Sequence, residues 1–364
     1  YDDAGLYANC SAPDCTTVSN SGGTFVVDVA HFTTYSTAVL PAFSLTECGV
    51  LNETGDYILV NDVNSSGTCF TLLNNTINLD CNNYQINYSQ STTGFGITTN
   101  GFSNLTIQRC NIVNVPQTAA HGINFVNVNN SIIQNNSFSV DGNLSVGLYL
   151  KQSNNNSLTN NTISTIGMGM AKFGIQLTTS ATNNTIANNI IRTQGSNNTN
   201  IGINLNGTVS GNLVSGNTIN TNGTDSNFGI QLLSSAHNNR ITNNIIQTQG
   251  SDYGNLGIWL TNTVSGNLVS GNTITTNGLE LSHGVLLQDV ANNNTVTNNT
   301  IRTQGSGGSN FGIWLSNPSS GNLVSGNVIT TNGTDSNTGV RLVAFANNNN
   351  VTNNTIRAQG SGNS

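Results

Sequence analysis

The residues best suited to metal or acid–base chemistry are three carboxylates that recur at a regular interval. Asp225, Asp252 and Glu280 each stand two residues after a glycine in equivalent positions of a repeated segment. If the repeats stack, these side chains lie near one another, and clustered carboxylate oxygens are the ligands that Ca²⁺ prefers. The alternative is a set of solvated carboxylates that keep the molecule soluble. We therefore expect a weak calcium site at most.

A catalytic group is harder to find. Acid–base chemistry on an acidic polysaccharide needs clustered carboxylates together with Arg or Lys to meet the substrate, and the repeats offer little of either. His121 and His283 stand where phenylalanine stands in other repeats, which favours a packing role. We therefore expect that the chain is not an enzyme.

Two tryptophans could bind a ligand. Trp259 and Trp314 occupy one position of two repeats, and Leu286 occupies it in the repeat between them. They alternate with aliphatic residues that belong to the interior, so they should point outward. An exposed aromatic stripe could stack sugars or form a lateral protein contact. It could also be an incidental stripe under a loop or glycan.

The element that positions all these residues is a repeat of 27 or 28 residues, which predicts a stacked solenoid. Its units begin at the tripeptides starting at Phe173, Ile201, Phe228, Leu256, His283, Phe311 and Thr338. The second residue after each start is Ile or Val and the fourth is Leu, a spacing of two that is typical of a strand. Each unit therefore predicts one coil of a β-helix with three short strands.

Asparagine and glycine recur in further columns. Two Asn columns, represented by Asn184 with Asn212 and by Asn189 with Asn217, should form amide ladders along the axis. A Gly column that includes Gly195 and Gly250 predicts a corner with positive φ. Successive units also alternate between "NNIIRTQGS" and "GNLVSGNTI", so the full period is two coils.

The cysteines indicate disulfides at the irregular end of the chain. All six lie in the first third, namely Cys10, Cys15, Cys48, Cys69, Cys81 and Cys110. Cys81 and Cys110 lie about one coil apart and should be stacked neighbours, and Cys48 with Cys69 and Cys10 with Cys15 are the natural remaining pairs. A metal site is the alternative, without the His clusters that would support it.

Composition and sequons point outside the cell. Charged residues make up 6% of the chain and the net charge is −7, which argues against nucleic acid, and no apolar run is long enough to span a membrane. Together with the disulfides, Asn-x-Ser/Thr sequons predict an extracellular or cell-surface glycoprotein. The candidates for glycosylation are Asn52, Asn64, Asn87, Asn104, Asn143, Asn206, Asn222 and Asn332.

The segments "CGVLNETGDYILVNDVNSSGTCFTLLNNTINLDCNNYQINYS" and "NLTIQRCNIVN" resemble the opening of right-handed parallel β-helix proteins of the NosD type. They are similar to β-helix surface proteins of archaea, and the later units match the generic repeat of that family. The resemblance implies the fold and leaves the function open, because such proteins include lyases, hydrolases, epimerases, adhesins and structural proteins. The paired-Asp, Gly-His-Gly and Arg-x-Lys signatures of polygalacturonases and the Asp-Pro-His-Glu of alginate epimerases are missing.

These observations predict an all-β chain with two parts. Residues 1–45 form a short disulfide-rich strand segment, and residues 46–364 form a right-handed parallel β-helix of about a dozen coils of 25–28 residues. The segment 24–36 reads as a strand without a sheet of its own, which could pair with the uncovered last coil of another copy. We expect a non-enzymatic structural glycoprotein that assembles end to end into a homopolymer. The alternatives are a carbohydrate-binding adhesin and a polysaccharide lyase or hydrolase.

Overall fold

The computed structural model describes residues 15–21, 24–29, 42–115, 119–167, 171–195, 199–334 and 336–360. The chain divides into two compact units, Tyr1–Ala42 and Phe43–Ser364. In the first, β1 (Cys15–Ser21) pairs antiparallel with β2 (Thr24–Val29). The strand expected within 24–36 therefore has a partner in its own unit, which corrects the expectation that it lacks a sheet. Cys10 and residues 30–36 lie outside the described residues.

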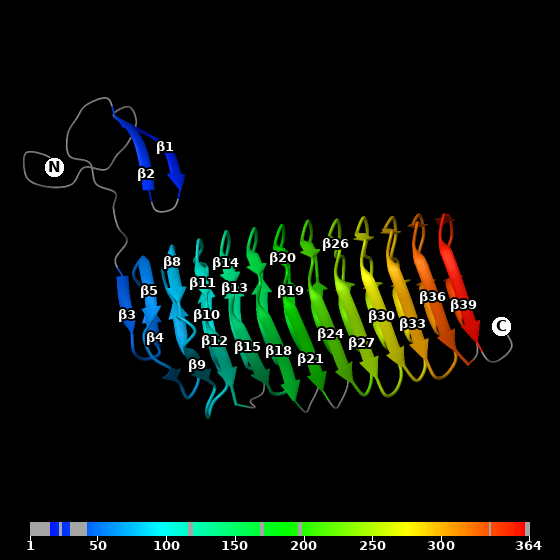
Figure 1. Cartoon of the computed structure of the whole chain (residues 1–364), viewed down its shortest axis with the longest axis horizontal. Coiled ribbons are helices and arrows are strands. Elements are labelled where there is room, and N and C mark those ends of the chain that lie inside the picture. Colours follow the sequence, from blue (N-terminus) through cyan, green and yellow to red (C-terminus); the bar gives the residue numbers. More distant parts are fainter. Residues whose placement is uncertain are drawn as a thin grey trace, which may run out of the picture. The chain divides into compact units, whose positions relative to one another are not determined.

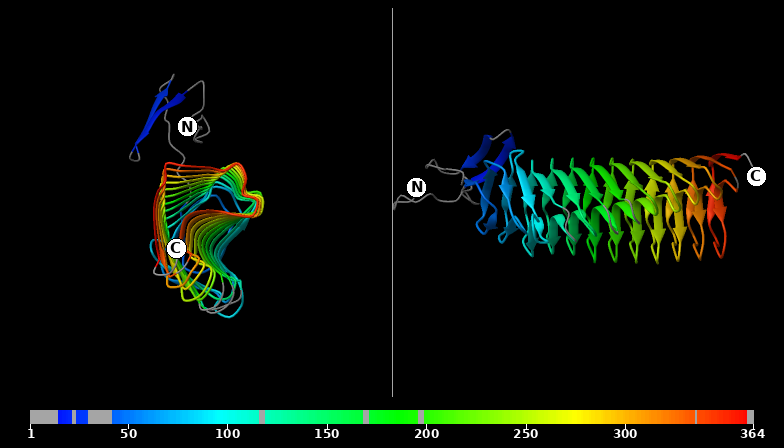
Figure 2. Two further views of the ribbon diagram at one scale, coloured as in Figure 1. Left: turned by 90° about the vertical axis from the view of Figure 1, so that its right-hand side faces the viewer. Right: turned by 90° about the horizontal axis from the view of Figure 1, so that it is seen from below.

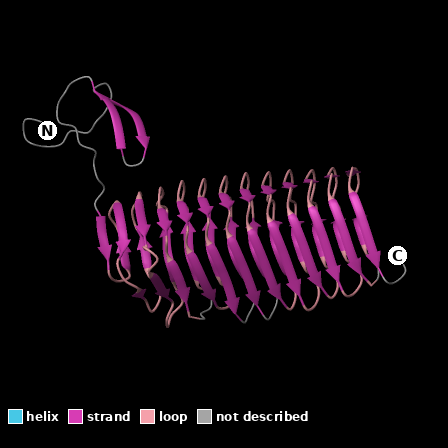
Figure 3. Ribbon diagram, in the orientation of Figure 1, coloured by secondary structure: helices cyan, strands magenta, loops and turns pink. Residues whose placement is uncertain are grey.

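The second unit is a parallel β-helix in which each coil adds one strand to each of three sheets (Figures 1 and 3). Sheet I contains β4 (Gly49–Leu51), β7 (Phe70–Leu72), β10 (Phe95–Asn100), β13 (His121–Val126), β16 (Val146–Lys151), β19 (Lys172–Thr178), β22 (Asn200–Asn206), β25 (Asn227–Leu233), β28 (Leu256–Thr261), β31 (His283–Gln288), β34 (Phe311–Leu315) and β37 (Thr338–Leu342).

Sheet II contains β3 (Ala42–Leu45), β5 (Gly55–Leu59), β8 (Ile77–Asp80), β11 (Thr106–Gln108), β14 (Ile132–Gln134), β17 (Ser157–Thr159), β20 (Thr185–Ala187), β23 (Leu213–Ser215), β26 (Arg240–Thr242), β29 (Leu268–Ser270), β32 (Thr295–Thr297), β35 (Leu323–Ser325) and β38 (Asn350–Thr352). Sheet III contains β6 (Val63–Asn64), β9 (Gln85–Tyr88), β12 (Asn111–Asn114), β15 (Ser137–Asp141), β18 (Thr162–Gly167), β21 (Ile190–Gly195), β24 (Thr218–Gly223), β27 (Ile245–Gly250), β30 (Thr273–Gly278), β33 (Thr300–Gly305), β36 (Val328–Gly333) and β39 (Thr355–Gly360).

The expected fold is confirmed, a right-handed parallel solenoid whose described residues contain no helix. Equivalent aliphatic residues pair from coil to coil, as Ile203 with Ile230 and Ile230 with Ile258. All three are fully buried. Identical side chains thus stack along the axis, and the interior is one continuous apolar column.

The glycine at the second position of each coil start interrupts the pairing in sheet I without shifting its register. Phe228 pairs with Leu256 and Ile230 pairs with Ile258, so Gly229 and Gly257 are passed over in the ladder. A Cβ on Gly257 would lie 2.2 Å from the Cγ2 of Ile274 and 2.5 Å from the carbonyl oxygen of Gly284. Only glycine fits this close approach.

Two buried Asn ladders connect the coils. The side-chain amide of Asn244 donates to the carbonyl of Val214 and to the Oδ1 of Asn272, at 2.9 and 3.0 Å. Its own Oδ1 accepts from the backbone N–H and the amide of Asn217. All four bonding positions of the amide are therefore used, in a place that water does not reach.

The Gly column of sheet III has a different cause from the expected corner. Gly195 and Gly250 do not adopt positive φ, but a Cβ on them would lie 2.7 and 2.4 Å from the Oδ1 of Asn200 and Asn255. Those two asparagines belong to a third, fully buried ladder at the entry to sheet I, in which Asn200 donates to Asn227 and Asn227 to Asn255. The glycines therefore make room for buried amides.

The two-coil period arises at the outer turns. Asn188 and Gly216 occupy equivalent turn positions of successive coils, and both have positive φ. The amide oxygen of Asn188 lies 2.5 Å from where a Cβ on Gly216 would be. Each asparagine side chain thus occupies the space next to the glycine of the following coil. The same arrangement recurs with Asn243 and Gly271.

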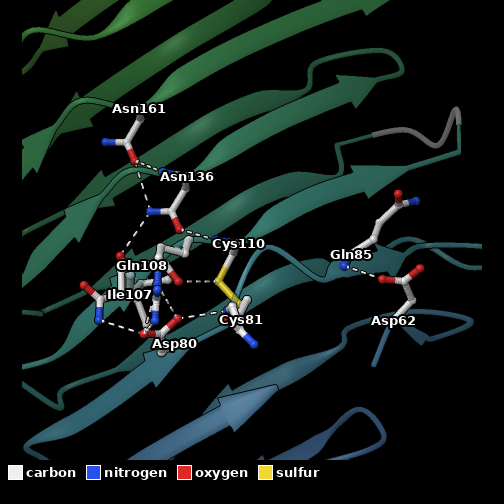
Figure 4. Close-up of a disulfide and its surroundings, with 11 residues drawn as sticks. Asp62, Asp80, Cys81, Gln85, Ile107, Gln108, Cys110, Asn136 and Asn161 are labelled. Carbon is white, nitrogen blue, oxygen red and sulfur yellow. Dashed lines mark hydrogen bonds and ion pairs between the residues drawn. A yellow bond between two sulfur atoms is a disulfide. The ribbon is translucent and has the colours of Figure 1, made fainter. Parts of the chain in front are cut away.

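Two of the expected disulfides are confirmed. Cys48 bonds to Cys69 and Cys81 to Cys110, each pair with Cα atoms 4.7 Å apart. The backbone N–H of Cys110 donates to the Oδ1 of Asn136, which is the first amide of one ladder (Figure 4). The Cys81–Cys110 bond therefore stands where the amide column begins, and it fixes the first coils in register.

We predict that the ladder amides carry stability and that a nearby buried hydroxyl does not. Asn244→Ala removes the acceptor of Asn217 and the donor to Val214. Each buried polar group that is left without a hydrogen-bond partner costs about 1–3 kcal/mol. Thr248 lies in a column of seven buried threonines whose hydroxyls have no partner, so Thr248→Val should leave stability unchanged or raise it. The midpoint of thermal unfolding, followed by circular dichroism, should fall for Asn244→Ala alone. Equal losses in both variants would contradict this account.

Candidate functional site

The outer face of sheet I carries a second apolar cluster, separate from the interior. Around this glycine the first and the fourth position of each strand both lie on the outer face. The cluster consists of Phe173, Ile201, Phe228, Leu256, Trp259, Leu286 and Trp314. Leu286 is 4% exposed, whereas Ile245 on the outer face of sheet III is 57% exposed. Viewed along the axis, the coil outline bends inward on one side (Figure 2).

Trp259 and Trp314 lie on this face, as expected for the outward position. The ring of Trp259 packs edge-on against Phe228, with centroids 4.9 Å apart. Trp314 packs edge-on against His283 and Phe311, and the guanidinium of Arg341 lies 5.7 Å from its centroid. Both rings keep part of their surface exposed, while their indole N–H groups are buried without a partner.

A polar group adjoins Trp259. Thr261, two residues further along β28, donates its hydroxyl to the Oδ2 of Asp289 at 3.2 Å. The amide of Gln288 donates to the same oxygen at 3.0 Å. An aromatic ring beside a fixed carboxylate, an amide and a hydroxyl is an arrangement suited to binding a sugar.

An amide row extends from this group toward the N-terminal coils. Trp259 pairs with Gln231, Gln231 with Asn204 and Asn204 with Gln176. Gln176 donates to Asn204 at 3.1 Å, and Asn204 donates to Gln231 at 2.8 Å. The outer face of sheet I is therefore polar but uncharged along this stretch.

The amide row ends at a group that could transfer protons. Tyr149 pairs with Gln176, and its ring stacks on His121 with centroids 5.3 Å apart. Its hydroxyl lies 3.2 Å from that of Thr178. Lys151 follows two residues later on the same strand and so shares the face. A histidine and a phenol are thus in contact, and a lysine lies two residues from the phenol on the same partly exposed face.

The two histidines of this face are neutral near pH 7. Burial lowers the pKa of His121 to about 4, and the backbone of Ala120 opposes this in part. The Nδ1 of His121 has no hydrogen-bond partner. Burial, then the charge of Arg341, lower the pKa of His283 to about 3. His283 is enclosed between Phe311 and Trp314, whereas His121 keeps part of its ring exposed.

Sequence reasoning missed the group formed by His121, Tyr149 and Lys151. His121 stands at the first position of its coil and Tyr149 at the fourth position of the next, so 28 residues separate them. One coil of 25 residues leads from His121 to its in-register partner Val146, and Tyr149 lies three residues further along the same strand. Carboxylates were the expected acid–base groups, so this pair was not predicted.

The other predicted residues lie apart from this face or remain predictions. In the described parts of the chain, no three His, Cys, Asp or Glu side chains form a group able to hold a metal ion. The weak calcium site expected at Asp225, Asp252 and Glu280 is not among such groups and stays a prediction. Of the glycosylation candidates, Asn52, Asn64, Asn104, Asn222 and Asn332 are exposed, and Asn87, Asn143 and Asn206 are half-buried. No helix within the described residues is long and apolar enough to cross a membrane.

Two family profiles match the chain. Residues 44–219 match the right-handed β-helix region, and residues 248–361 match NosD, the periplasmic copper-binding protein. The chain belongs to the right-handed parallel β-helix repeat family. A search of curated protein sequences gave no match. With two disulfides, this β-helix protein is placed outside the cytoplasm.

Solved structures with a similar fold include two epimerases and DFA-IIIase. A mannuronan C-5 epimerase A-module from Azotobacter vinelandii has a TM-score of 0.55 at 15% identity, covering 87% of this chain and 89% of that one. The periplasmic alginate epimerase AlgG has a TM-score of 0.59 at 14% identity, covering 85% and 76%. DFA-IIIase from Arthrobacter chlorophenolicus, in complex with DFA-III, has a TM-score of 0.51 at 15% identity, covering 83% and 75%.

These similarities overturn two expectations. The chain was expected to be a non-enzymatic structural glycoprotein that assembles end to end, and it was expected not to be an enzyme. Its fold is instead that of polysaccharide-active β-helix enzymes. At 14–15% identity the likeness establishes the fold, and any activity must be argued from the residues of this chain.

The residues that match the NosD profile do not fit copper. Residues 248–361 contain one histidine, His283, and neither cysteine nor methionine. Copper is held by imidazole, thiolate and thioether ligands in combination. His283 is 2% exposed and stacks on Phe311. We therefore derive no copper chemistry for this protein.

We predict that His121 and His283 make stability depend on pH. In the unfolded chain both take up protons below their ordinary pKa of 6.5, whereas the folded protein resists this until about pH 4 and 3. The free energy of unfolding should therefore fall as the pH drops from 6.5 toward 4, by about 3 kcal/mol for each ring at most.

The measurement is denaturant unfolding between pH 7 and 4 of the wild type and of His121→Phe with His283→Phe. Phenylalanine occupies this position in Phe228 and Phe311, so it fits. The difference in stability between variant and wild type should grow as the pH falls. A difference that stays constant would refute the role of the two rings.

Proposed function

We propose that this β-helix protein is an extracellular polysaccharide-processing enzyme that binds an extended chain along the outer face of sheet I. The observation that carries the proposal is the continuous row from His121 and Tyr149, through the amides of Gln176 and Asn204, to Trp259. The partly exposed amide of Gln176 can meet a sugar hydroxyl, and aromatic rings meet the apolar faces of sugars. The row runs along the axis, as a linear polymer would.

The group at the N-terminal end of the row suits proton abstraction beside a carboxylate. His121 is neutral and can take the proton at C5 of a uronic acid, and Lys151 can pair with its carboxylate. Tyr149 can give a proton to the oxygen that leaves C4 as the C4–O bond breaks, which yields an unsaturated sugar. Return of a proton to C5 from the opposite side would instead invert that carbon.

Hydrolysis fits this group less well. It needs a pair of carboxyl groups that flank the glycosidic bond, and the group of His121, Tyr149 and Lys151 contains none. We therefore favour a lyase or epimerase acting on a polyuronate. Such substrates lie outside the cytoplasm, in agreement with the disulfides.

We predict that Tyr149→Phe lowers the rate on a polyuronate about a hundredfold or more, because the proton donor is lost while the ring stack on His121 remains. Alginate and pectate should be tested, with ultraviolet absorbance reporting elimination and proton NMR reporting inversion at C5. Tyr84→Phe is the matched control, since Tyr84 is exposed and is not part of sheet I.

Two results would decide against the proposal. One is a folded wild-type protein that turns over no polyuronate; if it still binds one, the carbohydrate-binding reading replaces the enzymatic one. The other is full activity in Tyr149→Phe.

A further inference from the structure

The row on sheet I runs along the axis of the β-helix and has one residue in each coil. Tyr149, Gln176, Asn204, Gln231 and Trp259 pair in register from β16 to β28. Four strand steps of about 4.8 Å separate Tyr149 from Trp259 by roughly 19 Å. A sugar residue in an extended chain advances by about one such step. Trp259 is therefore in reach of a sugar several residues away from the one at Tyr149.

The residues between Tyr149 and Trp259 should contribute little to the affinity for a bound chain. Asn204 is 2% exposed and Gln231 is 7% exposed, and both amides are engaged with one another. Because their hydrogen-bonding groups are partly used, each contributes little further binding. A large gain in affinity is expected where the chain meets a free aromatic surface.

Trp259 provides that surface and its neighbours provide polar contacts. The ring is held edge-on by Phe228 and keeps part of its surface exposed. The carboxylate of Asp289 is oriented by Thr261 and Gln288 through its Oδ2. A carboxylate accepts hydrogen bonds from sugar hydroxyls and repels another carboxylate. This position therefore suits the hydroxyl-bearing side of a sugar.

Resting on the proposed function, we propose that Trp259 and Asp289 form a distal sugar-binding subsite, four coils from the reacting group, which makes the enzyme select long chains. Trp314, two coils further in the same column, is the next aromatic contact along the chain. The consequence is that short oligosaccharides react slowly even though they fill the site at Tyr149.

The test uses oligomannuronates and oligogalacturonates from disaccharide to decasaccharide. In the wild type, KM should fall roughly three- to tenfold once the chain is long enough to reach Trp259. Trp259→Leu should remove this step, so that KM no longer falls as the chain becomes long enough to reach position 259. Leucine fits because Leu286 occupies the same column. Trp314→Leu is the matched control, because it should affect only chains that extend two coils further.

A binding measurement keeps the subsite testable without turnover. Intrinsic tryptophan fluorescence, titrated with the same oligosaccharides, should change for long chains and not for short ones. Asp289→Asn provides a second variant, which keeps the size of the side chain. If no oligosaccharide is turned over, the proposed function fails, and the titration still decides the subsite. Identical length profiles in the wild type, Trp259→Leu and Asp289→Asn would overturn the inference.

Discussion

Stacked asparagine amides are the interaction on which the rest of this structure depends. A buried amide is tolerated only if its donors and acceptors all find partners, and Asn244 achieves this through Asn217, Asn272 and Val214. The partners exist only when each coil presents its asparagine at the same depth and angle. A slip of one residue would leave polar groups unpaired along the whole column. The ladders therefore fix the register of every coil, and with it the alignment of the side chains outside.

The interior was predictable from the sequence because it repeats. The pairing of Ile203 with Ile230, the two Asn columns and the stacking of Cys81 on Cys110 all follow from a period of one coil. The outer face was not predictable in the same way, since its residues differ from coil to coil. The glycine after His121 is required because Phe138 approaches it from another sheet, which no local pattern reveals. The first and fourth positions share the outer face around such glycines, and this allows His121 to contact Tyr149.

Two lysines of this weakly charged protein have different roles. Lys172 is fully buried, and its amine donates to the carbonyl of Gly142. Burial lowers its pKa while Asp141 opposes the change. It pairs with Asn200 and stands at the head of the third Asn column, so the ammonium group replaces a ladder amide there. The side chain of Lys151 lies on the outer face, outside the three Asn columns. Lys172 therefore has a structural role, whereas Lys151 can contact a ligand.

A scaffold of this kind separates stability from function. The aliphatic and amide columns hold the coils together, so an outer column can change its residues without disturbing them. The column of Tyr149 does this, with amides over three coils and then Trp259, Leu286 and Trp314. Because each coil adds the same rise, a residue's place in the chain sets its distance along a bound polymer. The coil in which a residue lies therefore determines which sugar of a bound polymer it can contact. The side chain of that residue determines the chemistry at that point.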